Sequence, residues 1–166
     1  MSLEQKPIIS IITVCLNAET TIEHTLRGVA EQENVDGLSE HIVVDGASDD
    51  GTLDIVQHFP HVQWISEPDD GIFDALNKGS HLATGEYLMH LFADDYLYDV
   101  NALSDVIAFI RSRNRPDWIA GDVARGQVLD GEMVILGPRR LVPPTCWGLI
   151  LRDQIAHPAV FLKREV

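Results

Sequence analysis

The sequence predicts a single α/β domain: a Rossmann-like, mainly parallel open sheet with helices on both faces. Short apolar runs alternate with segments whose apolar residues recur at helical spacing, as in successive βα units. The first run, residues 8–14, is β-branched and almost wholly apolar, which is typical of a strand covered on both faces. A chain of 166 residues with 45% hydrophobic content is long enough for one core of ordinary size.

The first part of the chain contains three strands joined by helical segments. The strand at 8–14, expected at the centre of the sheet, precedes a helix within 19–33. A second strand at 41–45 leads into a short helix at 51–58, and a third strand follows at 62–66, after the break at Pro60.

The middle of the chain continues the alternation. A turn rich in Pro and Gly at 67–71 precedes a helix at 72–83, and the apolar run 86–93 is predicted as a buried strand. A helix at 101–113 and a strand at 118–122 follow. The residues that we place on the core face of the helix at 72–83 are Ile72, Phe73, Leu76 and Ala83.

Three further segments of the chain have weaker patterns. Residues 128–136 are predicted to form a hairpin around Asp130-Gly131, and residues 159–162 are either a strand or the start of a helix. Residues 1–6 are expected to be disordered or tag-like, without an apolar signal segment. No run approaches the roughly 20 apolar residues of a membrane span. From the length of the chain we take 7–166 as one domain.

The net charge of −14 opposes binding to DNA or RNA, because Lys and Arg contacts with phosphates supply most of that affinity. The charge is uneven: residues 1–100 hold 19 acids and 3 bases, whereas residues 101–166 hold 7 acids and 9 bases. This distribution predicts a cation site in the first part, with solvated surface charge as an equal alternative. Cys15 and Cys146 have no metal-ligand spacing and are expected to be reduced, buried residues.

Carboxylates follow two of the predicted strands. Asp45 ends the run 41–44, and Asp94-Asp95 ends the run 86–93. Because the carboxyl ends of parallel strands meet at one edge, these acids are expected at the ligand-binding edge of the sheet. Mg²⁺ or Mn²⁺ commonly takes one or two carboxylates plus substrate phosphates. We favour Asp95 for the ion and Asp94 for a ribose hydroxyl; the alternative is a turn or a cap ahead of the helix at 101.

The segment 43–52 is a second candidate for ligand contact. Its glycines permit close backbone approach, and Asp45 can accept a hydrogen bond from a base N–H or a sugar hydroxyl. Asp49 or Asp50 is alternatively a cap for the helix that begins near Gly51. Residues 13–19 lack the Gly-x-Gly-x-x-Gly of a dinucleotide fold, which counts against an NAD enzyme.

Several blocks occur in a specific order: Asn17-Ala-Glu19 after the first strand, then residues 44–52, 67–79, 83–85 and 91–95. In this order and spacing they resemble family 2 glycosyltransferases of the GT-A fold. The resemblance extends over about residues 7–166. Where relatives more often have Leu-Asn-Ser-Asp-Asp, residues 91–95 are Leu-Phe-Ala-Asp-Asp; both acids remain, so the departure affects only local packing and polar contacts.

The resemblance implies roles for individual residues. Thr13 and Glu19 match positions that contact the nucleoside of the sugar donor, and Asp45 matches the acid that reads the base. Asp94 matches the acid that meets the ribose or sugar, and Asp95 the ligand of the Mn²⁺ or Mg²⁺ that bridges the pyrophosphate.

Lys78 has two interpretations of equal weight. By resemblance it approaches the donor phosphates; by its spacing it forms an exposed pair with Asp74, four residues earlier.

The reaction that the resemblance implies is metal-dependent, inverting transfer from a nucleoside-diphosphate sugar. The donor is expected to be a UDP-sugar rather than a GDP- or dTDP-sugar, and the acceptor a glycan or lipid-linked molecule in surface polysaccharide synthesis. Relatives carry the catalytic base downstream of the match to residues 157–161, beyond Val166, so we expect this chain to be truncated at its C-terminus. Asp122 and His157 are weak candidates for the base, since a core or loop role is expected more often for each.

Two other function classes remain as alternatives. One is a nucleotide-sugar-binding domain without transfer activity; the other is a nucleotidyltransferase, for which residues 13–19 lack the basic, Gly-rich phosphate loop. The expected location is the cytoplasm, with the inner face of the membrane as a second location. There, Arg139-Arg140 beside Trp147 would touch a lipid phosphate, unless this segment is a solvated loop.

Overall fold

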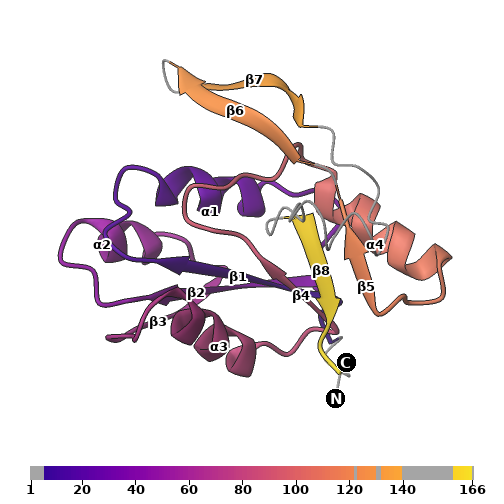
Figure 1. The fold of residues 1–166 in the computed structure, drawn as a ribbon, viewed down its shortest axis with the longest axis horizontal. Helices are drawn as coiled ribbons and strands as arrows, with labels where there is room; N and C mark the ends of the chain where they lie inside the picture. The colour runs from indigo at the N-terminus through magenta and orange to yellow at the C-terminus, as the bar shows by residue number, and fades with distance from the viewer. Residues whose placement is uncertain (1–5, 122, 130–131, 140–158, 166) are drawn as a thin grey trace, which may run out of the picture.

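The computed structural model describes residues 6–121, 123–129, 132–139 and 159–165, and the segments 123–129 and 132–139 are described by their backbone only. Six strands form one sheet in the order β3-β2-β1-β4-β8-β5 (Figure 1). Helices cover both faces of this sheet. The predicted class, a mainly parallel α/β sheet, is therefore confirmed.

Four neighbouring strands are parallel: β3 (Val62–Ser66), β2 (Ser39–Asp45), β1 (Ile9–Cys15) and β4 (Tyr87–His90). β1 lies between β2 and β4, in the interior of the sheet as predicted. In the register of these strands, Cys15 is opposite Asp45, and Asp45 is opposite Ser66. The ends of β1, β2 and β3 thus form one edge.

The other side of the sheet is antiparallel. β8 (Val160–Lys163) lies between β4 and β5 (Trp118–Ala120) and pairs antiparallel with both. Residues 159–162, whose structure the sequence left open, are thus mostly strand. β6 (Val123–Leu129) and β7 (Glu132–Arg139) form a separate antiparallel pair, longer than the hairpin predicted at 128–136.

Each of the four helices that the structure describes lies within its predicted range. They are α1 (Ile22–Ala30), α2 (Thr52–Val56), α3 (Ile72–Leu82) and α4 (Ala102–Ser112). The longest two have 11 residues, and within the described ranges no helix is long and apolar enough to cross a bilayer.

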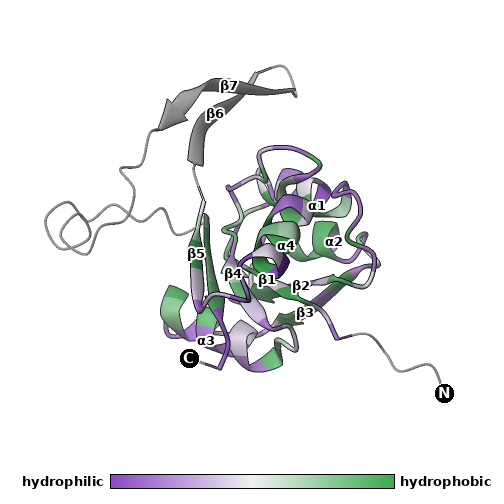
Figure 2. Cartoon of the chain, turned by 90° about the vertical axis from the view of Figure 1, so that its right-hand side faces the viewer, coloured by the Kyte–Doolittle hydropathy of each residue, from purple (hydrophilic) through white to green (hydrophobic). Residues whose placement is uncertain are grey.

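The alternation of side chains along β1 divides the core into two layers. Ile9 and Ile11 pack in one cluster with residues of α1 and α4, whereas Ile12 and Val14 pack in another with Ala75 of α3. Figure 2 shows the sheet between α3 on one side and α1, α2 and α4 on the other. This burial on both faces explains the almost continuous apolar character of β1.

Two predictions about these elements are wrong in detail. The strand predicted at 86–93 ends at His90, because the Asp95 N–H donates to the carbonyl oxygen of Phe92 and closes a turn (2.9 Å). Ile72 and Phe73 were placed on the core face of α3, but they are 48% and 77% exposed. The helix packs against the sheet one turn later, so its first turn has no core beneath it.

The Ala83-Thr-Gly85 block has a structural role at the end of the sheet opposite to Asp45. The carboxylate of the β2 residue Glu40 accepts hydrogen bonds from the Ser10 hydroxyl (2.6 Å) and from the backbone N–H groups of Thr84 (2.6 Å) and Gly85 (3.0 Å). Burial by itself would raise the pKa of Glu40. The hydrogen bonds together have a larger, opposite effect, so the net pKa lies below its usual value. The carboxylate therefore holds the start of β4 beside β1.

Gly79 is the point of closest contact between α3 and the sheet. A Cβ atom at this position would collide with Ile12 and lie 3.2 Å from Val44 Cγ2. We expect Gly79→Ala to lower the free energy of unfolding by about 1–3 kcal/mol, because overpacking outweighs the better helix propensity of alanine. Urea denaturation measures the change. Asn77→Ala, an exposed position of the same helix, is the control, and equal stability of the two variants would contradict the close packing.

Candidate functional site

Two loops at the carboxyl edge of the sheet interlock through hydrogen bonds. The Asn17 N–H donates to the Ser48 hydroxyl (2.8 Å), and Asn17 Oδ1 accepts from the Asp49 N–H (3.0 Å). The Ala18 N–H donates to the Thr52 hydroxyl (2.7 Å). Asn17 and Ala47 both have left-handed backbone, with φ of 52° and 64°. The loop after β1 and the loop after β2 therefore form one unit.

Asp45 lies at the centre of this unit and is fully buried. Its Oδ2 accepts from the Ser66 hydroxyl (2.6 Å) and the Ser48 N–H (3.1 Å), and its Oδ1 accepts from the Ser48 hydroxyl. Burial, and next the charge of Asp45, raises the pKa of the Cys15 thiol to about 12, so Cys15 is a neutral donor to Asp45 Oδ1 (S···O 3.7 Å). The acid predicted to read a base thus also holds its own loop.

Glu19 and Asp50 support the start of α2. Glu19 Oε2 accepts from the Gly51 N–H (2.9 Å), and Asp50 Oδ1 accepts from the Thr52 N–H (2.9 Å). The hydrogen bond from the Thr52 hydroxyl is the largest of the effects that hold the pKa of Asp50 below its usual value. The N-cap residue of α2 is Gly51, which makes no side-chain cap hydrogen bond, so Asp50 supports the first turn from one residue earlier. The predicted nucleoside residue Glu19 lies in the same cluster.

Thr13 is fully buried within the sheet, and its Oγ1 lies 2.9 Å from Nε2 of His41. Burial, and next the nearby His61, lowers the pKa of His41 to about 3, so the imidazole is neutral at physiological pH. The Thr13 hydroxyl thus has a protein partner two residues before the edge at Cys15.

Asp94 and Asp95 follow β4 at the same edge. Ala93 packs with Cys15 and Ile22, and the Thr25 hydroxyl of α1 donates to the Asp95 carbonyl oxygen (2.9 Å). Asp94 is exposed, whereas Asp95 is partly buried, and its Oδ2 accepts a long bond from the Phe92 N–H (3.3 Å). Both acids therefore stand next to the end of β1.

The electrostatics of this pair favour a cation. Burial raises the pKa of Asp95; the Phe92 N–H opposes this, and the charge of Asp94 adds to it, with a net increase. The pKa of Tyr96 is also raised, first by burial and then by the two aspartates. A bound cation would relieve this concentration of negative charge.

The donor atoms fit Mg²⁺ or Mn²⁺ in one respect: two carboxylates can hold such an ion when phosphates and water complete its shell. Among the described residues, no group of three or more His, Cys, Asp and Glu side chains is placed to hold a metal alone. The alternative that Asp94 or Asp95 caps α4 is wrong, since the carboxylate that accepts from the Asn101 N–H is that of Asp99 (2.9 Å). The alternative of a turn holds for Asp95, whose N–H donates to the Phe92 carbonyl oxygen.

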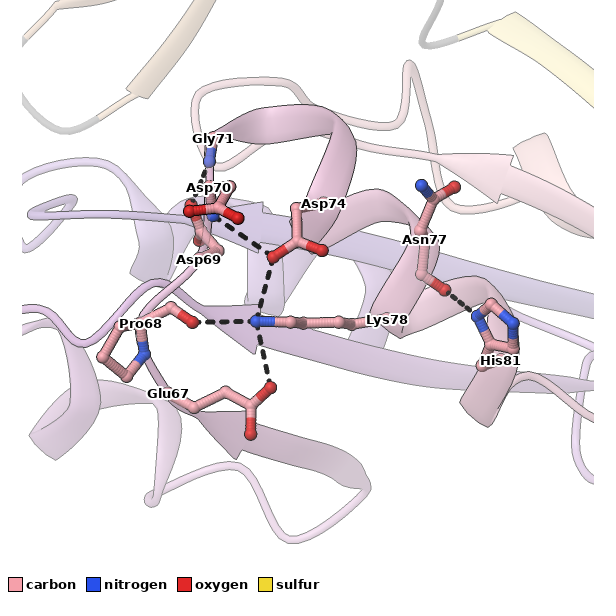
Figure 3. Close-up of polar contacts among 9 residues, drawn as sticks. All are labelled: Glu67, Pro68, Asp69, Asp70, Gly71, Asp74, Asn77, Lys78 and His81. Carbon is pink, nitrogen blue, oxygen red and sulfur yellow. Dashed lines mark hydrogen bonds and ion pairs between the residues drawn. The ribbon is translucent and has the colours of Figure 1, made fainter.

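Lys78 projects from α3 toward the turn after β3 (Figure 3). Its Nζ lies 2.8 Å from the Pro68 carbonyl oxygen, 3.0 Å from Glu67 and 3.1 Å from Asp74. The hydrogen bond to Glu67 is the largest cause of the raised pKa of Lys78. The predicted pair with Asp74 is confirmed, and the two partners in the turn were not predicted.

Asp69, which no sequence pattern indicated, lies against Gly46. Asp69 Oδ1 accepts from the Gly71 N–H (2.8 Å, Figure 3), and a Cβ on Gly46 would be 2.6 Å from Asp69 Oδ2. The glycine predicted to admit a ligand thus admits this side chain. The hydroxyls of Ser48 and Ser66, which hold Asp45, were also missed. Ser66 at the end of β3 was an available signal, whereas Ser48 lies in the loop after β2.

Other predicted positions lie outside the described residues. Asp122, Cys146, Trp147, His157 and Arg140 are in this group, and the side chain of Arg139 is not described. Their predicted roles stay predictions.

Known proteins resemble this chain in sequence. The model of the family described as Glycosyl transferase family 2 matches residues 10–135. A Mycobacterium bovis protein called "PGL/p-HBAD biosynthesis glycosyltransferase" is 38% identical over 170 residues, covering 95% of this chain and 60% of the relative. The Bacillus subtilis "Putative teichuronic acid biosynthesis glycosyltransferase TuaG" is 38% identical over 96 residues, covering 54% of this chain and 37% of that protein.

Solved structures show the same fold. S. aureus TarS 1-349 in complex with UDP-GlcNAc has a TM-score of 0.71 at 22% identity, covering 94% of this chain and 45% of TarS 1-349. The mannosyltransferase PcManGT from Pyrobaculum calidifontis, in complex with GDP-Man and Mn²⁺, has a TM-score of 0.64 at 25% identity, covering 72% and 36% of the two chains. The resemblance to GT-A glycosyltransferases is confirmed, and the chain spans about 60% of the mycobacterial relative.

The buried His41 predicts an acid-sensitive fold. Because the folded pKa of about 3 lies below the unfolded value of about 6.5, the unfolded state binds one more proton between these values. This contribution to stability is present at neutral pH and is lost as the pH falls below 6.5. We expect His41 alone to lower the free energy of unfolding by about 2 kcal/mol between pH 7.5 and pH 5.

Urea denaturation at the two pH values measures this loss. His41→Gln, which keeps a nitrogen for Thr13 and does not titrate, is expected to show a loss smaller by that amount. An identical pH dependence in the variant would exclude His41 as the source.

Asp95 is expected to destabilise the metal-free protein. Since burial and Asp94 raise its pKa, the charged carboxylate costs folding energy above that pKa, and Asp95→Asn removes the charge while keeping an acceptor for Phe92. We expect an equal or higher melting temperature in EDTA at pH 7.5, and a loss of any increase caused by Mn²⁺. Asp36→Asn, at an exposed loop position, is the control. A clear decrease in EDTA would show that the carboxylate has a stabilising partner.

Proposed function

This chain belongs to glycosyltransferase family 2, and we propose that it forms the donor-binding part of a metal-dependent, inverting enzyme. The donor is a nucleoside-diphosphate sugar, with UDP expected ahead of GDP or dTDP. The observation that carries the proposal is the pair Asp94-Asp95, placed after β4 at the edge where β1 and β2 also end. Ligands of open α/β sheets bind at this edge.

The donor contacts follow the order of the strands. We assign the nucleoside to the unit formed by the loops after β1 and β2, with Thr13 and Glu19 from the first and Asp45 from the second. The hydrogen bonds within this unit support the assignment, because they hold the backbone in place before a ligand arrives. To read the base, an Asp45 oxygen would accept a hydrogen bond from it in place of the one that the Ser48 or Ser66 hydroxyl now donates.

Asp95 and Asp94 are the residues that would hold Mn²⁺ or Mg²⁺, with Asp94 also meeting the ribose. When bound, the ion would supply positive charge for the departing diphosphate. Relatives give the proposal partial support, since PcManGT was solved with GDP-Man and Mn²⁺.

The proposed reaction exchanges one bond at the anomeric carbon of the donor sugar. The acceptor oxygen forms a bond to this carbon from the face opposite the diphosphate, and the bond to the diphosphate oxygen breaks. The nucleoside diphosphate leaves with the electron pair, and the acceptor proton passes to a base. Asp122 and His157 remain weak candidates for that base.

Lys78 would need a rearrangement to reach the donor phosphates. Its ammonium is held by Glu67, Asp74 and the Pro68 carbonyl oxygen, so a phosphate would have to replace at least one of these acceptors. We therefore propose that the first role of Lys78 is to hold the turn at 67–71 in place.

The proposed acceptor is a glycan or a lipid-linked molecule. Relatives are named for PGL/p-HBAD biosynthesis and for teichuronic acid biosynthesis, which indicates a place in glycolipid or polysaccharide synthesis. A nucleotide-sugar-binding domain without transfer is the second candidate, because no residue in the described part of the chain is assigned as the base that transfer requires.

Calorimetric titration tests the donor site. We expect UDP to bind in the presence of Mn²⁺, with at least tenfold weaker binding in EDTA or in Asp95→Asn, since both changes remove the charge interaction with the diphosphate. GDP, titrated in parallel, is expected to bind more weakly. Asp36→Asn is again the matched control.

Absence of binding for both nucleotides would contradict the donor site. Binding that Asp95→Asn leaves unchanged would contradict its metal role. Where UDP binds, donor turnover with a glycan acceptor separates the transferase from the binding domain.

A further inference from the structure

A basic pocket lies at the end of the sheet opposite to the donor edge. It has a volume of about 540 Å³, within the range of small-molecule sites. Its walls come from the residues before β1, those before β4, the end of β8 and the segment around the end of α4. The basic residues that line it are Lys6, Arg111, Arg115, Lys163 and Arg164.

The charge of this pocket contrasts with that of the chain. It contains five of the twelve Lys and Arg residues of a protein whose net charge is −14. The acidic residues in its lining are Glu86 and Glu165, which leaves a local excess of three positive charges. Like charges brought together in this way repel one another unless an anion neutralises them.

Two of the five bases have protein partners. Arg115 pairs with Glu86, and the Arg164 guanidinium donates to the Ala83 carbonyl oxygen. These contacts hold the two arginines at the pocket. Within the described part of the chain, Lys6, Arg111 and Lys163 have no carboxylate within ion-pair distance. Three cations are therefore available to a ligand.

The position of the pocket separates it from the donor site. Ile8 and Gly85 line it at the starts of β1 and β4, whereas Asp45 and Asp94-Asp95 follow the opposite ends of parallel strands. A ligand here would not share contacts with the nucleotide. Solvated surface lysines and arginines would be the simplest explanation if these bases were scattered, but they converge on one cavity.

We propose that this pocket binds a phosphate-bearing anion. Phosphate is favoured because arginine and lysine donors match its oxygens and because the local excess of charge is positive. The same chemistry is available from free phosphate and from the headgroup of an anionic lipid. The two sources differ in whether binding requires a bilayer.

The test uses the whole chain in EDTA. Without a metal ion, the carboxylates of the donor site repel anions, so phosphate does not bind there. Inorganic phosphate is titrated by calorimetry, and vesicles of phosphatidylglycerol in phosphatidylcholine are tested by co-sedimentation at low and high salt. The variant is Lys6→Glu/Arg111→Glu, which changes two bases without a described ion pair. The matched control is Arg113→Glu, near the end of α4 but outside the lining.

We expect binding of phosphate, or of phosphatidylglycerol vesicles alone, that falls at least tenfold in the double variant and weakens with salt. Saturation by inorganic phosphate would identify a soluble anion, and binding to vesicles only would identify a lipid headgroup. No binding of either probe, or an equal loss in Arg113→Glu, would overturn the proposal. UDP titration of the double variant with Mn²⁺ shows separately whether the donor site is intact.

Discussion

The pairing of β1 with β2 and β4 is the interaction on which the rest of the structure depends. Because these strands are parallel, their carboxyl ends meet at one edge, and the loops that follow them approach one another there. The hydrogen bonds between Asn17, Ser48 and Asp49 exist only in this register. The burial of β1 on both faces holds the register, since a slip by one residue would exchange its two apolar faces.

Charge is separated along the strands of this sheet. Carboxylates collect where β2 and β4 end, and bases collect where β1 and β4 begin. At the first end, Asp45 is satisfied by donors from Ser48 and Ser66. Burial raises the pKa of Asp95, and the charge of its exposed neighbour Asp94 adds to this increase. The protein thus satisfies one acid with internal hydrogen bonds, and the neighbouring pair is the one that we propose for a cation. The two ends of the sheet are suited to opposite kinds of ligand.

Sequence reasoning succeeded where a residue pattern is local. The strand at 62–66 has its predicted bounds, and the described helices lie within their predicted ranges. It failed where the partner is distant. The spacing of Ile72 and Phe73 fits a core face, but whether a sheet lies beneath the first turn depends on where the helix crosses β1 and β2. The predicted strand at 86–93 was too long because residues 91–93 are apolar, although the chain turns between Phe92 and Asp95.

By itself, the sequence determined the order of strands and helices, the acids at the strand ends and the family, because each depends on residue types at short spacing. The tertiary structure alone decided which polar groups meet. It inserts β8 between β4 and β5, places Asp69 against Gly46 and directs Lys78 to Glu67 and Pro68. It also gathers bases from three segments into one pocket. Contacts of this kind join residues far apart in the chain or depend on side-chain direction, so no short-range pattern encodes them.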